Sequence, residues 1–220
     1  MENFDDKIFA ELEQAWSLLT NNSCIQAKSM VEKYMESTDD DVRYNAMKVT
    51  GLADFKLKNY EQARRYLQTI ATQYGEPDDW FDYSTAAVLS GNIQEGMDAF
   101  SEALSEAREN PNDCNVPIPE MLFYMLQALR DMNQFQLAFE KLDQLKDIYI
   151  SMEQTDEHFL YEHGIPHLEN TLKAGKKVLE NLNRKMVSDW LTDFAERTDE
   201  SGREEITEFK KTLDSFVNYG

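Results

Sequence analysis

The stretch LKNYEQARRYLQTI, residues 57–70, decides the fold expected for this chain. A polar turn at Lys58 and Asn59 is followed by an aromatic residue, Tyr60, and then by a small residue, Ala63, inside a helical pattern. Two helices joined by a short turn cross closely just after it, and a small side chain there lets their backbones meet. The stretch therefore predicts the corner of a helical hairpin, with Ala63 at the contact between its two helices.

The same corner recurs elsewhere in the chain. A turn, an apolar residue, two polar residues and a small residue follow one another in GNIQEGMDAF and NQFQLAFEKL, and a weaker copy is NNSCIQAKSMV. The small residues are 36, 33 and 42 positions apart, and they are Ala27, Ala63, Gly96 and Ala138. Repetition at such spacings is typical of stacked helical hairpins, because each hairpin buries its apolar face only against a neighbour.

These corners resemble those of the tetratricopeptide repeat (TPR) family. The copy in residues 78–111 carries most of the resemblance, with Trp80 in its first helix, Gly91 at its turn and Phe100 in its second helix. Gly51 occupies the family's usual glycine position in the preceding copy. The first and last copies keep the apolar spacing but depart further from the family pattern.

The resemblance covers about residues 5–150. It implies an all-α fold, a right-handed superhelical solenoid of TPR-like hairpins, with about four helix pairs in residues 1–153. Residues 154–220 are expected to form a C-terminal helical cap, because a solenoid needs its last apolar face covered.

Helix boundaries in the repeat region follow from turn and capping residues. Pro77 and Pro119 suit helix starts, Asn59 and Asn92 suit caps, and Gly75 suits a stop. We expect helices at residues 4–20, 24–36, 41–57, 60–74, 78–90, 93–109, 119–132 and 135–153.

The C-terminal region follows a different pattern. Apolar or small residues alternate in steps of four and three, which predicts one long helix over residues 166–197. Ser201 and Glu204 suit a capping box for a final helix. The two stripes are Leu168, Leu172, Gly175, Leu179, Leu182 and Met186, then Ile206, Phe209, Leu213 and Phe216. The alternative to a cap is that these helices form the seam of a homodimer.

Composition and charge exclude several classes of protein. The 220 residues include 42 acidic and 22 basic ones, a net charge of −20, which repels phosphate backbones, so we expect no nucleic-acid partner. No apolar run approaches the roughly 18 residues of a membrane span, and MENFDDKIFAELEQ lacks signal-peptide features. Cys24 and Cys114 suggest no disulfide framework, which is typical of a reducing compartment. We therefore expect a cytoplasmic protein without a membrane partner.

The sequence shows no recognised catalytic signature. It has no nucleotide-binding glycine loop and no nucleophile motif, so we expect no enzyme activity and no cofactor. His158, His163 and His167 fall within ten residues, but Gly164 and Pro166 interrupt any helix that would present them together. Solvated or capping histidines are the expected interpretation, and metal binding is the alternative.

The acidic charge is unevenly distributed. Residues 41–75 carry six basic and three acidic residues, whereas residues 76–115 carry one basic and ten acidic residues. The family resemblance implies a groove on the first helices of the hairpins. There we expect partner-binding residues at Asp78, Phe81, Asp82 and Phe123.

An acidic groove with aromatic residues suits a basic peptide or helix. Lys48 is the only basic residue expected on the groove side of the first three units, so the carboxylate clamp of some TPR domains is absent. The expected function is therefore non-catalytic binding of a basic partner segment, as an adaptor, scaffold or small chaperone. The alternatives are a peptide-sensing regulatory protein and a helical enzyme whose site no motif reveals.

Overall fold

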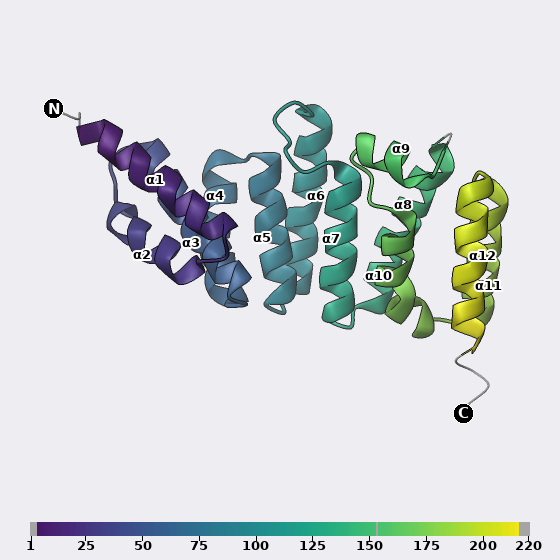
Figure 1. Ribbon diagram of the computed structural model, residues 1–220. Coiled ribbons are helices and arrows are strands. Elements are labelled where there is room, and N and C mark those ends of the chain that lie inside the picture. The colour runs from purple at the N-terminus through teal and green to yellow at the C-terminus, as the bar shows by residue number, and fades with distance from the viewer. Residues whose placement is uncertain (1–3, 153, 216–220) are drawn as a thin grey trace. The chain divides into compact units, whose positions relative to one another are not determined.

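The structure is a computed structural model that describes residues 4–152 and 154–215, with side chains for residues 7–152 and 154–213 (Figure 1). Every regular element in these ranges is a helix, so the predicted all-α class is confirmed. None of the described helices combines the length and apolar character that a membrane crossing requires.

The chain forms two compact units, residues 1–115 and 116–220. The fourth hairpin therefore belongs to the same unit as the C-terminal helices, whereas the sequence predicted a division near residue 153. The first unit contains α1 (Phe4–Thr20), α2 (Cys24–Val31), the 3-10 turn η1 (Glu32–Tyr34), α3 (Asp40–Lys56), α4 (Tyr60–Tyr74), α5 (Pro77–Leu89) and α6 (Ile93–Glu109). The second contains α7 (Ile118–Asp131), α8 (Phe135–Ser151), α9 (Glu157–Glu162), α10 (Leu168–Glu180), α11 (Arg184–Arg197) and α12 (Glu200–Ser215).

One corner geometry recurs at four helix junctions. Two residues before α2, α4, α6 and α8, the backbone takes a positive φ of 58°, 63°, 93° and 57°, at Asn22, Lys58, Gly91 and Asn133. The next amide donates to a carbonyl five residues back at 2.8–2.9 Å, in the pairs Ser23–Leu18, Asn59–Asp54, Asn92–Ala87 and Gln134–Leu129. This is the Schellman ending of a helix, which satisfies carbonyls that the helix leaves free.

The small residues lie five positions after these turn residues. Ala27, Ala63 and Ala138 are fully buried. At Gly96 an added Cβ would lie 2.6 Å from Val88 Cγ2 and 2.8 Å from the Ser84 carbonyl oxygen. Only a residue without a side chain fits there, because the α5 backbone itself occupies the space. The predicted helix contact at the small positions is confirmed.

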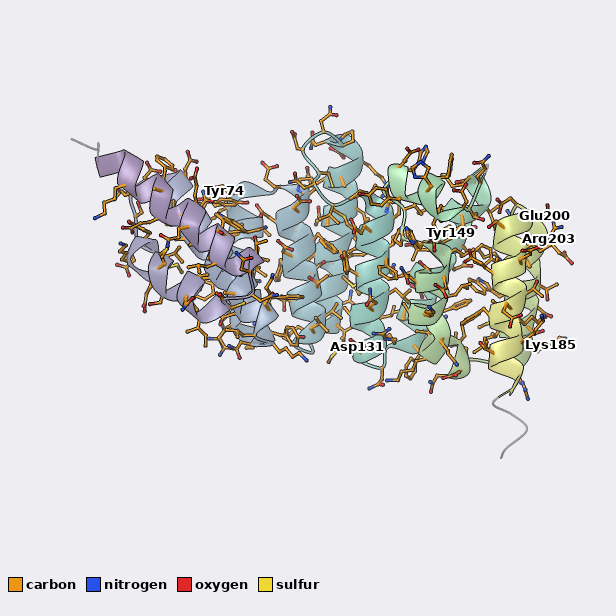
Figure 2. The ribbon with its side chains drawn as sticks, viewed as in Figure 1. Tyr74, Asp131, Tyr149, Lys185, Glu200 and Arg203 are labelled. Carbon is orange, nitrogen blue, oxygen red and sulfur yellow. The ribbon has the colours of Figure 1, made fainter. Side chains whose placement is uncertain are left out.

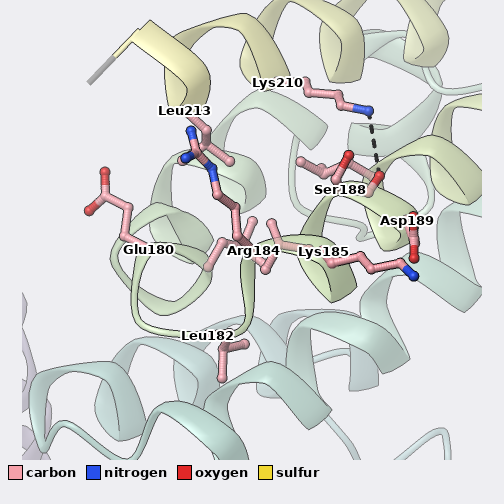
Figure 3. Close-up of a pocket in the computed structure, with 11 residues that line it drawn as sticks. Glu180, Leu182, Arg184, Lys185, Ser188, Asp189, Lys210 and Leu213 are labelled. Carbon is pink, nitrogen blue, oxygen red and sulfur yellow. Dashed lines mark hydrogen bonds between the residues drawn. The ribbon is translucent and has the colours of Figure 1, made fainter. Parts of the chain in front are cut away.

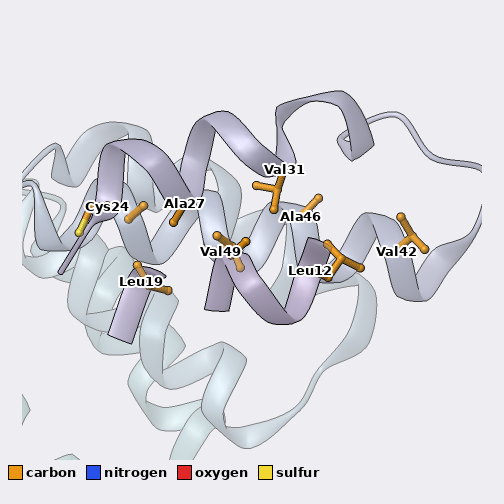
Figure 4. Packing of buried hydrophobic residues seen from close by; sticks show 10 residues of the cluster. Leu12, Leu19, Cys24, Ala27, Val31, Val42, Ala46 and Val49 are labelled. Carbon is orange, nitrogen blue, oxygen red and sulfur yellow. The ribbon is translucent and has the colours of Figure 1, made fainter. Parts of the chain in front are cut away.

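The first unit is held together by two apolar clusters. One joins α1, α2 and α3, and Figure 4 shows its members packed between these helices: Leu12, Ala15, Leu19, Cys24, Ala27, Val31, Val42, Ala46, Val49 and Ala53. The other joins α3 to α6 through Met47, Ala63, Leu67, Ile70, Ala71, Tyr83, Ala86, Ala87 and Ala99. Apolar burial between successive hairpins thus supplies the main attraction.

The second unit is organised around α8. Tyr149, labelled in Figure 2, is fully buried, and its hydroxyl donates to the Pro166 carbonyl at 2.6 Å. Leu142 lies against α10, where a Cβ on Gly175 would approach it to 2.8 Å. Its α8 neighbour Phe139 has its ring centre 5.6 Å from that of Trp190 in α11. Helix α8 therefore packs against both α10 and α11.

Three expectations for the helices are wrong. Residues 166–197 do not form one helix: α10 ends at Glu180, and Asn183 caps α11 by accepting a hydrogen bond from the Met186 amide at 3.1 Å. The final helix does not begin at a Ser201 capping box, because Asp199 accepts from the Gly202 amide at 3.0 Å. The helix expected at 24–36 ends at residue 31. The predicted stripe residue Phe216 lies outside the described residues.

Other helix signals are confirmed. Gly75 ends α4 in the left-handed conformation with φ 74°, and Pro77 and Pro119 lie in the first turns of α5 and α7. Asn59 and Asn92 occupy N-cap positions, but neither side chain makes a capping hydrogen bond. Their amides close the preceding helix instead, so the turn sets these positions.

Candidate functional site

The predicted partner-binding residues divide between the two units. Asp78, Phe81 and Asp82 belong to α5 in the first unit, and Phe123 belongs to α7 in the second. Each group is therefore described within its own unit. Their role in partner binding stays a prediction.

Asp82 takes part in a buried charge cluster between α3 and α5. Lys48 from α3 forms ion pairs with Asp79 and with Asp82, whose Oδ2 lies 2.7 Å from the Lys48 Nζ. The Tyr44 hydroxyl donates to Asp79 Oδ1 at 3.0 Å. The side chains of Lys48 and Asp79 are 8% and 0% exposed, while 25% of the Asp82 side chain remains exposed. The cluster joins the first helices of two successive hairpins.

The electrostatics of this cluster follow from burial and pairing. Burial by itself would lower the pKa of Lys48, but the Asp82 and Asp79 carboxylates outweigh it and raise that pKa above its usual value. Burial raises the pKa of Asp82, and attraction to Lys48 opposes this rise. Asp79 Oδ2 is buried and has no hydrogen-bond partner among the described residues. Two carboxylates therefore share one ammonium.

Sequence reasoning missed Asp79 and the pairing of Lys48. A signal was available, because Lys48 precedes Asp79 by 31 positions, close to the spacing of the hairpins. Residues separated by one repeat occupy matching places on neighbouring first helices. An ion pair between Lys48 and an aspartate one repeat further along the chain could therefore have been predicted from the sequence.

Asp78 holds the segment that follows α6. Its Oδ2 accepts hydrogen bonds from the Asn115 backbone amide at 3.1 Å and from the Asn115 side-chain amide at 2.6 Å. The Cys114 Sγ lies 3.8 Å from Asp78 Oδ1. Asp78 thus has a structural role in the first unit.

Phe81 is a packing residue. Its side chain is 6% exposed, and its ring centre lies 6.4 Å from that of Phe100 in α6. In this arrangement a partner could reach Phe81 only if α5 moved.

Phe123 lines a pocket of about 320 Å³ in the second unit. It is half-buried, and Tyr161, which is 76% exposed, lies on the same pocket. The remaining lining residues are Glu120, Gly164, Ile165, Pro166, His167 and Asn170. The pocket can hold an apolar or aromatic group, with the carboxylate of Glu120 beside it.

The three histidines have separate surroundings. His158 Nε2 lies 3.3 Å from Glu162 Oε1, and His163 stacks on Phe159 with ring centres 4.2 Å apart. His167 occupies the N-cap position of α10. Within the described ranges, no group of three or more His, Cys, Asp or Glu side chains has a geometry that could hold a metal ion.

Comparison of the chain with known protein families, with curated proteins and with solved structures finds no match in any of the three. The resemblance to TPR proteins stays a prediction, carried by the corners and the small residues.

Proposed function

We propose that the chain is a non-catalytic protein-interaction module of the cytoplasm, an adaptor, scaffold or small chaperone. Its hairpins would form a right-handed TPR-like solenoid whose last face is covered by the C-terminal helices. The four equivalent corners, each followed after five residues by a buried small residue, support this arrangement. Cys24 and Cys114 form no disulfide in the described part of the chain, which supports a reducing compartment.

The partner segment is proposed to be basic. The observation that carries this proposal is the α3–α5 cluster, where two carboxylates share the ammonium of Lys48 and one Asp79 oxygen has no partner among the described residues. The partly exposed Asp82 carboxylate can accept a Lys or Arg side chain from solvent. Since residues 76–115 carry ten acidic residues and one basic residue, the same segment also attracts a cation over longer range.

Phe123 supplies a separate apolar contact in this proposal. The pocket that it shares with Tyr161 suits a large apolar side chain, and Tyr161 exposes an aromatic ring that a partner could cover. Aromatic residues of this kind are enriched where protein partners bind.

The test begins with capture of partners by the full chain and their identification by mass spectrometry. Once a partner segment is identified, the rate at which it associates with the chain should fall as the salt concentration rises. Salt limits the range of the electrostatic attraction to about 10 Å at 0.1 M. The variant Asp78→Asn with Asp82→Asn should slow association. Asparagine is preferred to lysine here, because a lysine at residue 82 would place a second ammonium beside Lys48.

A matched control removes the same charge from the same acidic segment. Asp98→Asn with Glu102→Gln alters the exposed side of α6 and should leave the affinity almost unchanged. Equal effects of the two double variants, or an association rate that does not depend on salt, would contradict the acidic α3–α5 site. Capture of no protein, together with thermal stabilisation by free peptides, would favour the peptide-sensing regulator instead.

A further inference from the structure

A pocket of the second unit lies where the end of α10, the turn to α11, the first part of α11 and helix α12 come together (Figure 3). Its volume is about 940 Å³. This lies near the upper end of the roughly 300–1,000 Å³ typical of pockets that enclose a ligand. Leu179, Leu182 and Leu191 contribute apolar walls, so the pocket can bury several apolar groups.

Cations surround this apolar surface. Arg184, Lys185 and Lys210 line the pocket, together with the two carboxylates of Glu180 and Asp189. Lys210 donates a hydrogen bond to Thr192 Oγ1 at 2.8 Å. Among the described side chains, none of the three cations forms an ion pair with a carboxylate. The cations are thus available to an anionic group that enters from solvent.

The local charge is opposite to that of the whole chain. The chain carries a net charge of −20, yet residues 173–185 contain five basic residues and one acidic residue. Arg184 and Lys185 are the first two residues of α11, and its first turn contains no acidic residue. Cations at a helix N-terminus are disfavoured by the helix dipole, so helix stability does not explain these two residues. A departure from a local rule of this kind is expected where a residue serves binding.

We propose that this pocket binds an acidic amphipathic segment of a partner protein. Apolar side chains of the segment fill the space beside Leu179, Leu182 and Leu191, and its carboxylates meet Arg184, Lys185 and Lys210. Charge complementarity selects an acidic segment over a basic one, and the apolar walls select a segment with large side chains on one face. The site differs in place and in charge from the acidic α3–α5 surface, so either proposal can fail while the other stands.

The probe is a panel of fluorescent helical peptides of about 14 residues, with leucine or phenylalanine at positions i, i+3, i+4 and i+7 and Asp or Glu elsewhere. A matched panel replaces every Asp and Glu with Lys. Fluorescence anisotropy with the full chain should show binding of acidic peptides at least about tenfold tighter than of their basic counterparts. Failure of the whole acidic panel to bind, or equal affinity for both panels, would overturn the proposal.

Variants of the chain then test whether the peptides bind at this pocket. Arg184→Glu with Lys185→Glu should weaken binding of the acidic peptides by about tenfold or more, since both cations face the carboxylates. The control Lys7→Glu with Lys58→Glu makes the same change in net charge on exposed positions of the first unit and should change the affinity less than about twofold. Unfolding in urea must match the parent for both variants. Equal losses of affinity in the two variants would mean that binding depends only on the net charge of the chain, and would contradict binding at this pocket.

Two further measurements exclude other occupants. Sedimentation should show the same oligomeric state for the parent and for the Arg184→Glu, Lys185→Glu variant, whereas a dimer lost in the variant would assign the pocket to a second copy of the chain. A chain ending at residue 215 should bind the acidic peptides within about twofold of the parent. A large gain in affinity on removing residues 216–220 would assign the pocket to the chain's own C-terminal residues and would overturn the proposal.

Discussion

Each of the two units encloses a lysine between helices, and the two lysines have different partners. In the first unit Lys48 is 8% exposed and pairs with Asp79 and Asp82, of which Asp79 is fully buried. In the second unit Lys146 is 7% exposed, but its partner Asp193 keeps 49% of its side chain in solvent. The Lys146 Nζ also lies 5.3 Å from the centre of the Trp190 ring. The first lysine pairs with one fully buried and one partly exposed carboxylate, while the second pairs with an exposed one.

The two units also differ in how far apart in the sequence their hydrogen-bonded and ion-paired side chains lie. The indole of Trp16 donates to Asn45 across 29 residues, and Lys48 reaches Asp79 across 31, both close to one hairpin. The indole of Trp190 donates to Asp143 across 47 residues, the same separation as between Lys146 and Asp193. Helix α9 and its flanking residues lengthen the step in the second unit. Regular hairpin spacing therefore describes the first unit and fails where α9 intervenes.

The largest expected effect concerns the two lysines. Lys48→Met should reduce the free energy of unfolding by about 3–5 kcal/mol, because it leaves the buried Asp79 carboxylate without a cation. Lys146→Met should cost only about 0–1 kcal/mol, because water can solvate the exposed Asp193. Urea unfolding of both variants measures the difference.

The origin of the Lys48 effect can be tested separately. Adding Asp79→Asn and Asp82→Asn to Lys48→Met should recover part of the lost stability, because the uncompensated charge is then removed. No recovery would mean that packing rather than charge accounts for the loss. Equal costs at Lys48 and Lys146 would remove the distinction between the two units.

An intermediate effect is expected at the small residues that both units share. Ala63→Leu and Ala138→Leu should each lower the free energy of unfolding by about 1–3 kcal/mol, because a larger side chain overpacks a fully buried contact. Urea unfolding checks both. A control substitution, Ala10→Leu, alters an exposed position of α1 and should change stability by less than about 0.5 kcal/mol. If Ala138→Leu is tolerated and Ala63→Leu is not, the corner in the second unit is not equivalent to those in the first.

The smallest expected effect depends on pH. Asp199 caps α12 and also accepts from the Thr155 amide at 3.1 Å, so Asp199→Ala should cost about 0.5–2 kcal/mol at neutral pH. Burial raises the pKa of Asp199, but hydrogen bonds from Thr155 and Gly202 outweigh it and lower that pKa overall. Because the folded-state pKa is below the unfolded value of about 3.9, this stabilisation is complete above that value and is lost as pH falls through the folded pKa.

The control for this pH dependence is a neutral cap in the same unit. Asn183→Ala removes the hydrogen bond to the Met186 amide, and its cost should not change with the ionisation of an acid. Urea unfolding is measured from pH 7 down to about pH 2.5. The difference in free energy of unfolding between parent and variant should shrink for Asp199→Ala and stay constant for Asn183→Ala. A constant difference for both would mean that the Asp199 charge contributes nothing.

Local signals predicted much of the helical structure. The bounds expected for α1, α4 and α6 agree with the structure, and Gly75, Pro77 and Pro119 mark helix ends as predicted. A Schellman turn uses atoms within six successive residues, so a short stretch of sequence contains all the information for it. The helix break at Asn183 was missed because a repeating apolar stripe can continue across a short turn.

The candidate site was predicted less completely. Asp82 is partly exposed as a groove residue should be, but the pairing with Lys48 and the burial of Asp79 and Phe81 depend on how α3, α5 and α6 pack. Which residues of an acidic segment face solvent, and which cation neutralises them, cannot be read from local pattern. The pocket beside Arg184 and Lys185 was missed for the same reason, since residues 179–191 and residues 210–213 form it together.

The sequence by itself determined the all-α class, the four hairpin corners and the small residues at their contacts. These features depend on backbone geometry and side-chain size within a few successive residues. Only the tertiary structure decided the division into two units, the burial of Lys48 between two aspartates and the cation-lined pocket of the second unit. Such features arise when residues about 30 to 50 positions apart meet, and their energies depend on burial, which no single segment specifies.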